Sequence, residues 1–128
     1  MKADETRSTF ENLDVWKVAR ELRKDISRIA KGLPKFEQNK LTDQLIRASR
    51  SITANIAEGH GRYHYQENIQ FCRQSRGSSF ELLDHLTVAL DEEYMGIDEF
   101  QSFRTRIFRV VKLLNAYIRY LRNRKETD

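Results

Sequence analysis

The chain has 128 residues and a formal net charge of +4, and 39% of its residues are hydrophobic while 33% are charged. This length provides for one domain with a substantial core, and the composition is typical of a globular protein rather than a disordered one. The single cysteine, Cys72, excludes an internal disulfide framework. No stretch approaches the roughly 18 apolar residues of a membrane span, and the polar N-terminus lacks the apolar segment of a signal peptide. We therefore expect a soluble, cytoplasmic protein that has no membrane partner.

Apolar residues recur at steps of three and four in four segments, which is the spacing of amphipathic helices in a bundle. We predict helices over approximately residues 13–32, 38–59, 65–94 and 98–124. They form one domain over residues 12–124, between a polar tail at 1–11 and a short tail at 125–128. Short connections favour antiparallel neighbours. The predicted fold is all-α, an antiparallel up-down-up-down four-helix bundle.

Residues with known capping preferences mark the predicted helix ends. Asn12 or Asp14 is expected to cap the first helix, which ends at Gly32 with Pro34 just beyond. Asp98 is the expected N-cap of the fourth helix.

Polar and small residues interrupt the apolar pattern near the end of the second helix. Asn55 follows Ile52 on the predicted seam, where a buried amide fixes register at a cost in stability. Its expected neighbours on the third helix are Ser75, Ser78 and Ser79.

The glycines that follow are expected to end this helix. We predict that Gly59 is a left-handed C-cap, that Gly61 lets the chain reverse, and that Glu58 pairs with Arg62 or with a basic residue of the third helix. The residues assigned to this structural polar motif are Asn55, Glu58, Gly59, Gly61, Ser78 and Glu81.

No catalytic or metal-binding arrangement is recognisable in the sequence. Glu58, His60, His64 and Glu67 lie within ten residues, but no facing helix supplies the Glu-x-x-His motif of carboxylate-bridged bundles. Cys72 lies on an apolar helix side, which is typical of a small buried thiol. We expect no catalytic residue, no metal and no cofactor, and we predict that the protein is not an enzyme.

Arginines supply the remaining functional signal. Arg47 and Arg50 are i,i+3 neighbours, as are Arg73 and Arg76, so the two helices could present one electropositive patch. Forked guanidinium donors suit phosphate, and aromatic rings such as Tyr120 stack on unpaired bases. The alternative is that these cations complement helix dipoles or pair with nearby glutamates. The candidate nucleic-acid-binding residues are Arg47, Arg50, Arg62, Arg73, Arg76, Arg119, Arg122 and Arg124.

The fourth helix carries a second apolar row beside its seam, made of Phe108, Val111 and Ile118. A broad core-facing stripe would explain this row, and so would a subunit interface. We predict the interface, and therefore a homo-oligomer.

Several short motifs occur in a specific order over residues 10–120. They are FENLDVW from Phe10, Leu33-Pro34, LTDQL from Leu41, RASRSI from Arg47, ANIAEG from Ala54, Gly61-Arg62, and GSSFEL from Gly77. In this order they resemble the bacterial four-helix-bundle family named after open reading frames inside intervening sequences of 23S ribosomal RNA genes. Arg76 departs from that pattern, because a small or apolar residue is expected there.

The resemblance implies an up-down four-helix bundle that assembles as a homopentamer, with no enzymatic activity and with a link to ribosomal RNA. More distantly, the chain is similar to accessory proteins of diversity-generating retroelements, which implies contact with nucleic acid and a reverse transcriptase. The predicted function is a non-enzymatic oligomeric protein that binds structured RNA, or DNA, through arginine-rich surfaces. The alternative is an interaction scaffold that recruits a protein partner such as a reverse transcriptase.

Overall fold

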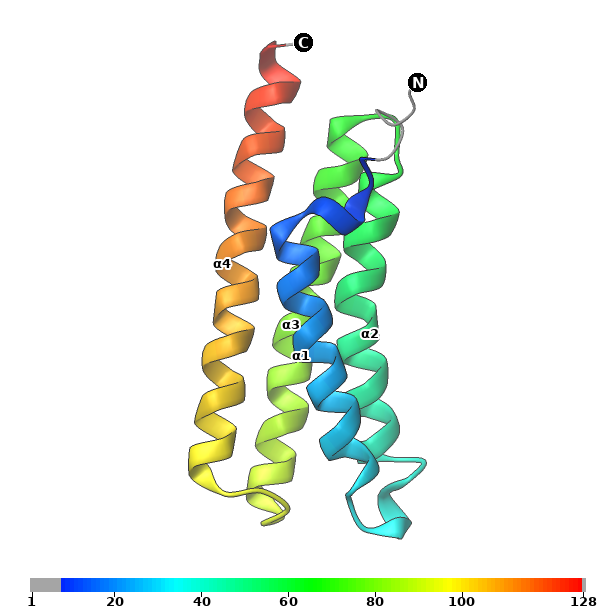
Figure 1. Ribbon diagram of the computed structural model, residues 1–128, viewed down its shortest axis with the longest axis vertical. Helices are drawn as coiled ribbons and strands as arrows, with labels where there is room; N and C mark the ends of the chain where they lie inside the picture. The colour runs from blue at the N-terminus through cyan, green and yellow to red at the C-terminus, as the bar shows by residue number, and fades with distance from the viewer. Residues whose placement is uncertain (1–7, 128) are drawn as a thin grey trace.

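A computed structural model describes residues 8–127, so residues 1–7 and Asp128 of the two predicted tails lie outside the described residues. The helices are α1 (Asp14–Lys31), α2 (Leu41–His60), α3 (Tyr65–Asp91) and α4 (Ile97–Thr127), and two short 3-10 helices are η2 (Phe10–Asn12) and η3 (Lys35–Glu37). In Figure 1, α1 and α3 run in one direction while α2 and α4 run in the other. The predicted all-α, up-down-up-down four-helix bundle is confirmed.

Each helix buries the apolar stripe that its sequence predicts. α2 packs most extensively on α3, whereas α1 and α4 share the smallest helix contact. Burying one such aliphatic side chain stabilises a fold by about 1.5–3 kcal/mol. The largest fully buried side chains are Leu22, Ile26, Leu45, Ile52, Ile56, Ile69, Leu82, Leu86, Ile107, Val110, Leu114 and Leu121. Along residues 8–127, every helix falls short of the combined length and apolarity that a membrane span requires.

The second helix begins at Leu41 rather than at residue 38, because a different structure occupies the residues before it. η3 fills Lys35–Glu37. The buried Glu37 carboxylate then accepts hydrogen bonds from the Leu41 backbone N–H at 3.3 Å and from the Tyr94 hydroxyl at 2.7 Å. The bond to Glu37 raises the pKa of Tyr94 to about 12 and links the α1–α2 and α3–α4 connections.

Other predicted boundaries also change. α3 ends at Asp91, whereas the sequence predicted a helix to residue 94. Just beyond this end, Glu93 adopts a left-handed φ of 64°, and the Tyr94 N–H donates back to the Ala89 carbonyl. α4 continues to Thr127, so residues 125–127 are helical rather than a tail. At the other end, residues 10–11 lie in η2 and not in a tail.

The predicted N-caps are wrong at both helices. α1 has Leu13 at its N-cap and no side-chain cap. The Asn12 side chain instead accepts a hydrogen bond from the Thr9 N–H at 3.1 Å, which closes η2. α4 begins at Ile97, so Asp98 lies in its first turn, where a carboxylate still complements the helix dipole. Gly32 does form the C-cap of α1, in a right-handed conformation.

Gly59 is a helical residue and not the predicted left-handed cap. It lies inside α2, the C-cap is Gly61 with a φ of −79°, and no glycine among the described residues has a positive φ. A Cβ atom at Gly59 would lie 2.7 Å from Asn68 Oδ1 and 2.8 Å from Phe71 Cβ of α3. A glycine is therefore required because α2 and α3 approach closely at this point.

Asn55 is only half-buried, and Ile56 takes the core position instead. The Asn55 amide donates to Ser51, to its carbonyl at 2.9 Å and to its hydroxyl at 3.0 Å, and the Ser51 hydroxyl bonds to Ser78 Oγ at 2.7 Å. Of the three predicted neighbours, Ser78 is therefore joined to Asn55 through the Ser51 hydroxyl.

The other two serines complete the α2–α3 contact in different ways. The Ser75 hydroxyl donates to the Ile52 carbonyl of α2 at 2.8 Å, while the Ser79 hydroxyl donates to the Ser75 carbonyl within α3. Both serines are fully buried. Small polar side chains therefore satisfy their own hydrogen bonds while allowing the two backbones to lie close together.

One carboxylate ties α1 to α4. Asp25 accepts from Arg106 of α4 at 2.8 Å and from Arg28 at 2.7 Å, with 30% of its side chain exposed. The hydrogen bond from Arg106, followed by that from Arg28, lowers the pKa of Asp25 below its ordinary value of 3.8. This ion pair reinforces the helix pair with the smallest contact.

Replacing Gly59 with alanine should destabilise the bundle by about 1–3 kcal/mol, because the added methyl group overlaps Asn68 and Phe71. Gly77→Ala is the matched control, since its Cβ meets nothing within 4 Å in mid-α3 and alanine is favoured there by about 0.5–1 kcal/mol. Urea unfolding followed by circular dichroism measures both changes. Equal stabilities would contradict the close approach of α2 and α3.

Asp25→Asn should lower the free energy of unfolding by about 0.5–1 kcal/mol at neutral pH. Because the folded-state pKa is depressed, this stabilisation is fully present above about pH 5 and is lost as the pH falls through the folded-state pKa. The gap between the unfolding free energies of the natural and variant chains should therefore narrow as the pH falls below 3.8, the ordinary pKa of the Asp25 carboxyl. Asp84→Asn, which breaks no ion pair among the described side chains, controls for the loss of a carboxylate. A gap that does not change with pH would contradict the Asp25 ion pairs.

Candidate nucleic-acid interface

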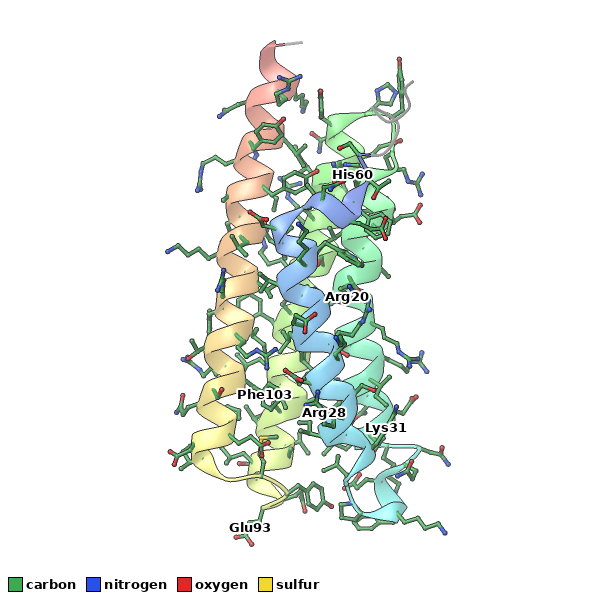
Figure 2. The ribbon with its side chains drawn as sticks, in the orientation of Figure 1. Arg20, Arg28, Lys31, His60, Glu93 and Phe103 are labelled. Carbon is green, nitrogen blue, oxygen red and sulfur yellow. The ribbon has the colours of Figure 1, made fainter. Side chains whose placement is uncertain are left out.

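α4 carries a long run of positive charge without a compensating acid. No aspartate or glutamate occurs between Phe100 and Lys125. The cations of this stretch are Arg104, Arg106, Arg109, Lys112, Arg119, Arg122, Arg124 and Lys125. Acidic residues gather instead around the α3–α4 connection, as Asp91, Glu92, Glu93, Asp98 and Glu99. Figure 2 shows Glu93 at the end of the bundle opposite His60. Charge is therefore separated along α4, with acids in its first turn and cations in its last.

The neighbouring part of α3 also lacks acids. From Asn68 to Phe80 its charged residues are Arg73 and Arg76. Arg76 Nη1 donates to Asn115 Oδ1 of α4 at 2.7 Å, which places Arg76 on the α4 side of α3. Arg73 precedes it by three residues and so shares this helix face.

Exposed residues of α3 and α4 form one continuous surface. Positions 104, 108, 112, 115, 119 and 122 follow one another along α4 at steps of three and four, on the side that meets α3. We call this surface the α3–α4 basic face, and its members are Arg73, Arg76, Arg104, Lys112, Arg119 and Arg122.

The α4 cations differ in whether a partner neutralises them. Arg106 points to the α1 side and pairs with Asp25 at 2.8 Å. Lys112, Arg119 and Arg122 are exposed and make no ion pair within the part of the chain that the structure describes. Their charges are therefore available to an external anion.

Aromatic rings interrupt the basic face. Phe80 of α3 and Phe108 of α4 meet edge to face at a centroid distance of 5.9 Å, and they remain 44% and 37% exposed. The Arg104 guanidinium lies 4.7 Å from the centre of the Phe108 ring. Phe108 is predicted from the sequence to lie at a subunit interface. Its pairing with Phe80, and the places of Arg104 and Lys112 on the α3–α4 basic face, follow only from contacts between helices.

A second aromatic group lies near the C-terminal part of α4. Tyr120 stacks on Tyr117 at 6.1 Å and is 54% exposed, while Tyr63 of the α2–α3 connection is almost fully exposed. These rings border a pocket of about 200 Å³ between that connection and α4. Lys125 Nζ donates to Gln66 Oε1 at 2.6 Å, which ties the end of α4 to the start of α3.

The predicted single patch of arginines on α2 and α3 is wrong. Arg47 pairs with Asp43 along α2 at 3.5 Å. Arg50 lines a groove together with Arg23 of α1, whereas Arg73 and Arg76 belong to the α4 side of α3. The i,i+3 spacing places each pair on one helix face, but the two faces are turned toward different neighbours.

Arg62 is held at the end of α2. It pairs with Glu58 at 2.8 Å, as predicted, and its guanidinium lies 4.8 Å from the centre of the Phe71 ring. The remaining predicted arginines, Arg119, Arg122 and Arg124, are exposed along α4.

Most of the predicted subunit interface belongs to the protomer core. Val111 is 7% exposed and Ile118 is 3% exposed, and both join the hydrophobic cluster of the bundle. α4 needs this broad stripe because it packs on both α3 and α1. Of the three residues, only Phe108 is exposed.

Two reactive side chains, the Cys72 thiol and the Tyr117 hydroxyl, have pKa values that burial raises. Cys72 is fully buried, and burial raises the pKa of its thiol to about 12, so the thiol is protonated at neutral pH. Burial likewise raises the pKa of Tyr117, whose hydroxyl accepts from Asn68 at 3.2 Å. Glu81 of the predicted structural polar motif has its Oε2 atom 3.4 Å from Nε2 of His85, within α3. No group of three or more histidine, cysteine or acidic side chains in this range is placed to hold a metal ion.

A family model and a solved structure both match this chain. The family model described as 23S rRNA-intervening sequence protein matches residues 11–116. A crystal structure from Bacteroides thetaiotaomicron, of a protein with unknown function from the S23 ribosomal protein family, has a TM-score of 0.72 and 22% sequence identity, covering 81% of this chain and 97% of that chain. At this identity the likeness establishes the fold, and curated proteins give no match. Because the family model spans most of the bundle, the chain belongs to the family of 23S rRNA-intervening sequence proteins.

Proposed function

We propose that this protein binds nucleic acid without catalysing a reaction, with RNA as its partner, through the α3–α4 basic face. The observation that carries the proposal is the run of cations along α4, which has no acid between Phe100 and Lys125. Lys112, Arg119 and Arg122 stand exposed and without ion pairs among the described side chains. A helix surface with this charge is the electrostatic footprint expected of a protein that contacts phosphates.

The chemistry of the face suits a phosphate backbone. Arginine presents several N–H donors in a fixed fork that matches phosphate oxygens, and lysine adds a mobile point charge. The steps of three and four along α4 spread these donors over several helical turns, so they meet consecutive phosphates rather than a single anion.

Two observations favour RNA over DNA as the partner. The family is named after an intervening sequence of 23S rRNA. Tyr63 and Tyr120 also present exposed rings beside the cations of α4, and unpaired bases in RNA loops and bulges stack on such rings. RNA with single-stranded segments is therefore the expected ligand.

Binding to a fluorescently labelled RNA, measured by anisotropy at increasing salt, tests this proposal. Affinity should fall steeply with salt because bound cations release counterions from the phosphates. The variant Lys112→Gln/Arg119→Gln/Arg122→Gln should reduce the slope of log affinity against log salt by about 2, since each phosphate contact to a single strand contributes about 0.7.

The matched control is Lys24→Gln/Arg28→Gln/Arg47→Gln. It removes the same charge, but each of these cations is paired with an acid of its own helix. For this control, the slope of log RNA affinity against log salt should stay within about 0.5 of the slope for the natural chain. Equal losses in both variants, or binding that does not depend on salt, would contradict the assignment to α4.

A second candidate function, a protein-interaction scaffold, is favoured by the exposed Phe80–Phe108 pair. Exposed aromatic rings are common anchors at protein interfaces. Assembly of several copies of this chain, proposed from the family resemblance, would bury the same two rings. Light scattering of the nuclease-treated protein distinguishes the candidates. The scaffold is supported if the natural chain self-associates and the Phe108→Ser variant is monomeric with unchanged RNA affinity. A natural chain that is monomeric would argue against the scaffold.

A further inference from the structure

A groove between α1 and α2 combines positive charge with an apolar wall. Its volume is about 470 Å³, within the range of small-molecule sites. The lining residues are Phe10, Trp16, Arg23, Arg50, Thr53, Ala54 and Ala57. None of them belongs to the α3–α4 basic face, and none is acidic.

The two arginines of the groove lack acidic partners. Arg23 Nη1 donates to the Thr53 hydroxyl at 2.8 Å, and Arg50 has no side-chain hydrogen bond or ion pair among the described residues. Two arginines therefore line one groove that has no carboxylate in its lining.

A hydrogen-bond relay fixes the position of Arg23. The buried Thr53 hydroxyl accepts from Arg23 and donates to the Arg50 backbone carbonyl at 3.2 Å. Arg23 is thus anchored through one nitrogen, and its other N–H donors remain for a ligand. Because Arg23 is already ordered in the unliganded protein, this side chain loses less conformational entropy when a ligand binds.

Aromatic and small residues shape the rest of the groove. Phe10 of η2 packs edge to face against Trp16 at a centroid distance of 5.0 Å, which holds the indole at the rim. Ala54 and Ala57 leave the adjoining surface of α2 without long side chains. A flat group can therefore lie between the indole and this surface.

We propose that this groove binds a phosphate monoester attached to a planar ring, of which a nucleoside monophosphate is the simplest example. The phosphate lies between Arg23 and Arg50, and the ring lies against Trp16 and the alanines. A phosphate monoester carries about two negative charges at neutral pH and matches two guanidinium groups, whereas a carboxylate carries one. The site is independent of the proposed RNA contact on α4.

Trp16 reports directly on this groove because it is the only tryptophan of the chain. AMP added to the full-length protein should change the Trp16 fluorescence saturably, and inorganic phosphate should compete with it. Adenosine, which lacks the phosphate, and benzoate, which carries one charge, should each bind about tenfold more weakly or worse. Equilibrium dialysis provides the same affinities without relying on fluorescence.

Arg50→Gln should weaken AMP binding by about tenfold or more, since it removes one charged donor group from an exposed position. The control is Arg20→Gln, because Arg20 lies over the Trp16 ring at 5.7 Å but does not line the groove, and this variant should change AMP affinity less than about twofold. Figure 2 shows Arg20 on α1. Adenosine or benzoate binding as tightly as AMP, an unchanged affinity in Arg50→Gln, or no saturable binding would each overturn the proposal. RNA binding through α4 should be unaffected by Arg50→Gln, so the two proposals fail separately.

Discussion

The close approach of α2 and α3 at Gly59 is the constraint on which the arrangement of the bundle depends. Asn68 and Phe71 occupy the space that any larger side chain at Gly59 would need. Farther along the same contact, Ser75 bonds to the Ile52 carbonyl and Ser78 bonds to Ser51. The small residues on this side of α3 allow it to pack closely against α2. This packing fixes the rotation of α3 about its own axis.

That rotation decides which surfaces are left for function. With its small residues turned toward α2, α3 turns Arg76 and Phe80 toward α4, where they meet Asn115 and Phe108. The α3–α4 basic face is therefore a consequence of packing on the opposite side of α3. The groove that contains Arg50 is lined by residues of η2, α1 and α2 and shares no residue with this face.

The sequence predicted the fold well because apolar periodicity is a property of each helix alone. It could not predict how each helix is rotated, since rotation depends on contacts between helices. Arg50 and Arg73 are a clear case, because spacing places each on a definite face of its own helix but does not reveal which neighbour that face meets. Gly59 is another case, since a glycine near a helix end also matches a left-handed cap. Its right-handed backbone and its closeness to α3 are known only from the structure. The acid-free run of α4, by contrast, was readable from the residues themselves.

The distribution of charge along α4 has a consequence for how the molecule meets a polyanion. Asp98 and Glu99 lie at its first turn, while Arg124 and Lys125 lie at its last, so the side chains form an electric dipole that opposes that of the peptide backbone. A polyanion at a distance repels one end of this half of the molecule and attracts the other. The resulting torque turns the C-terminal end of α4 toward the polyanion before any contact forms, which raises the fraction of collisions that begin in a productive orientation.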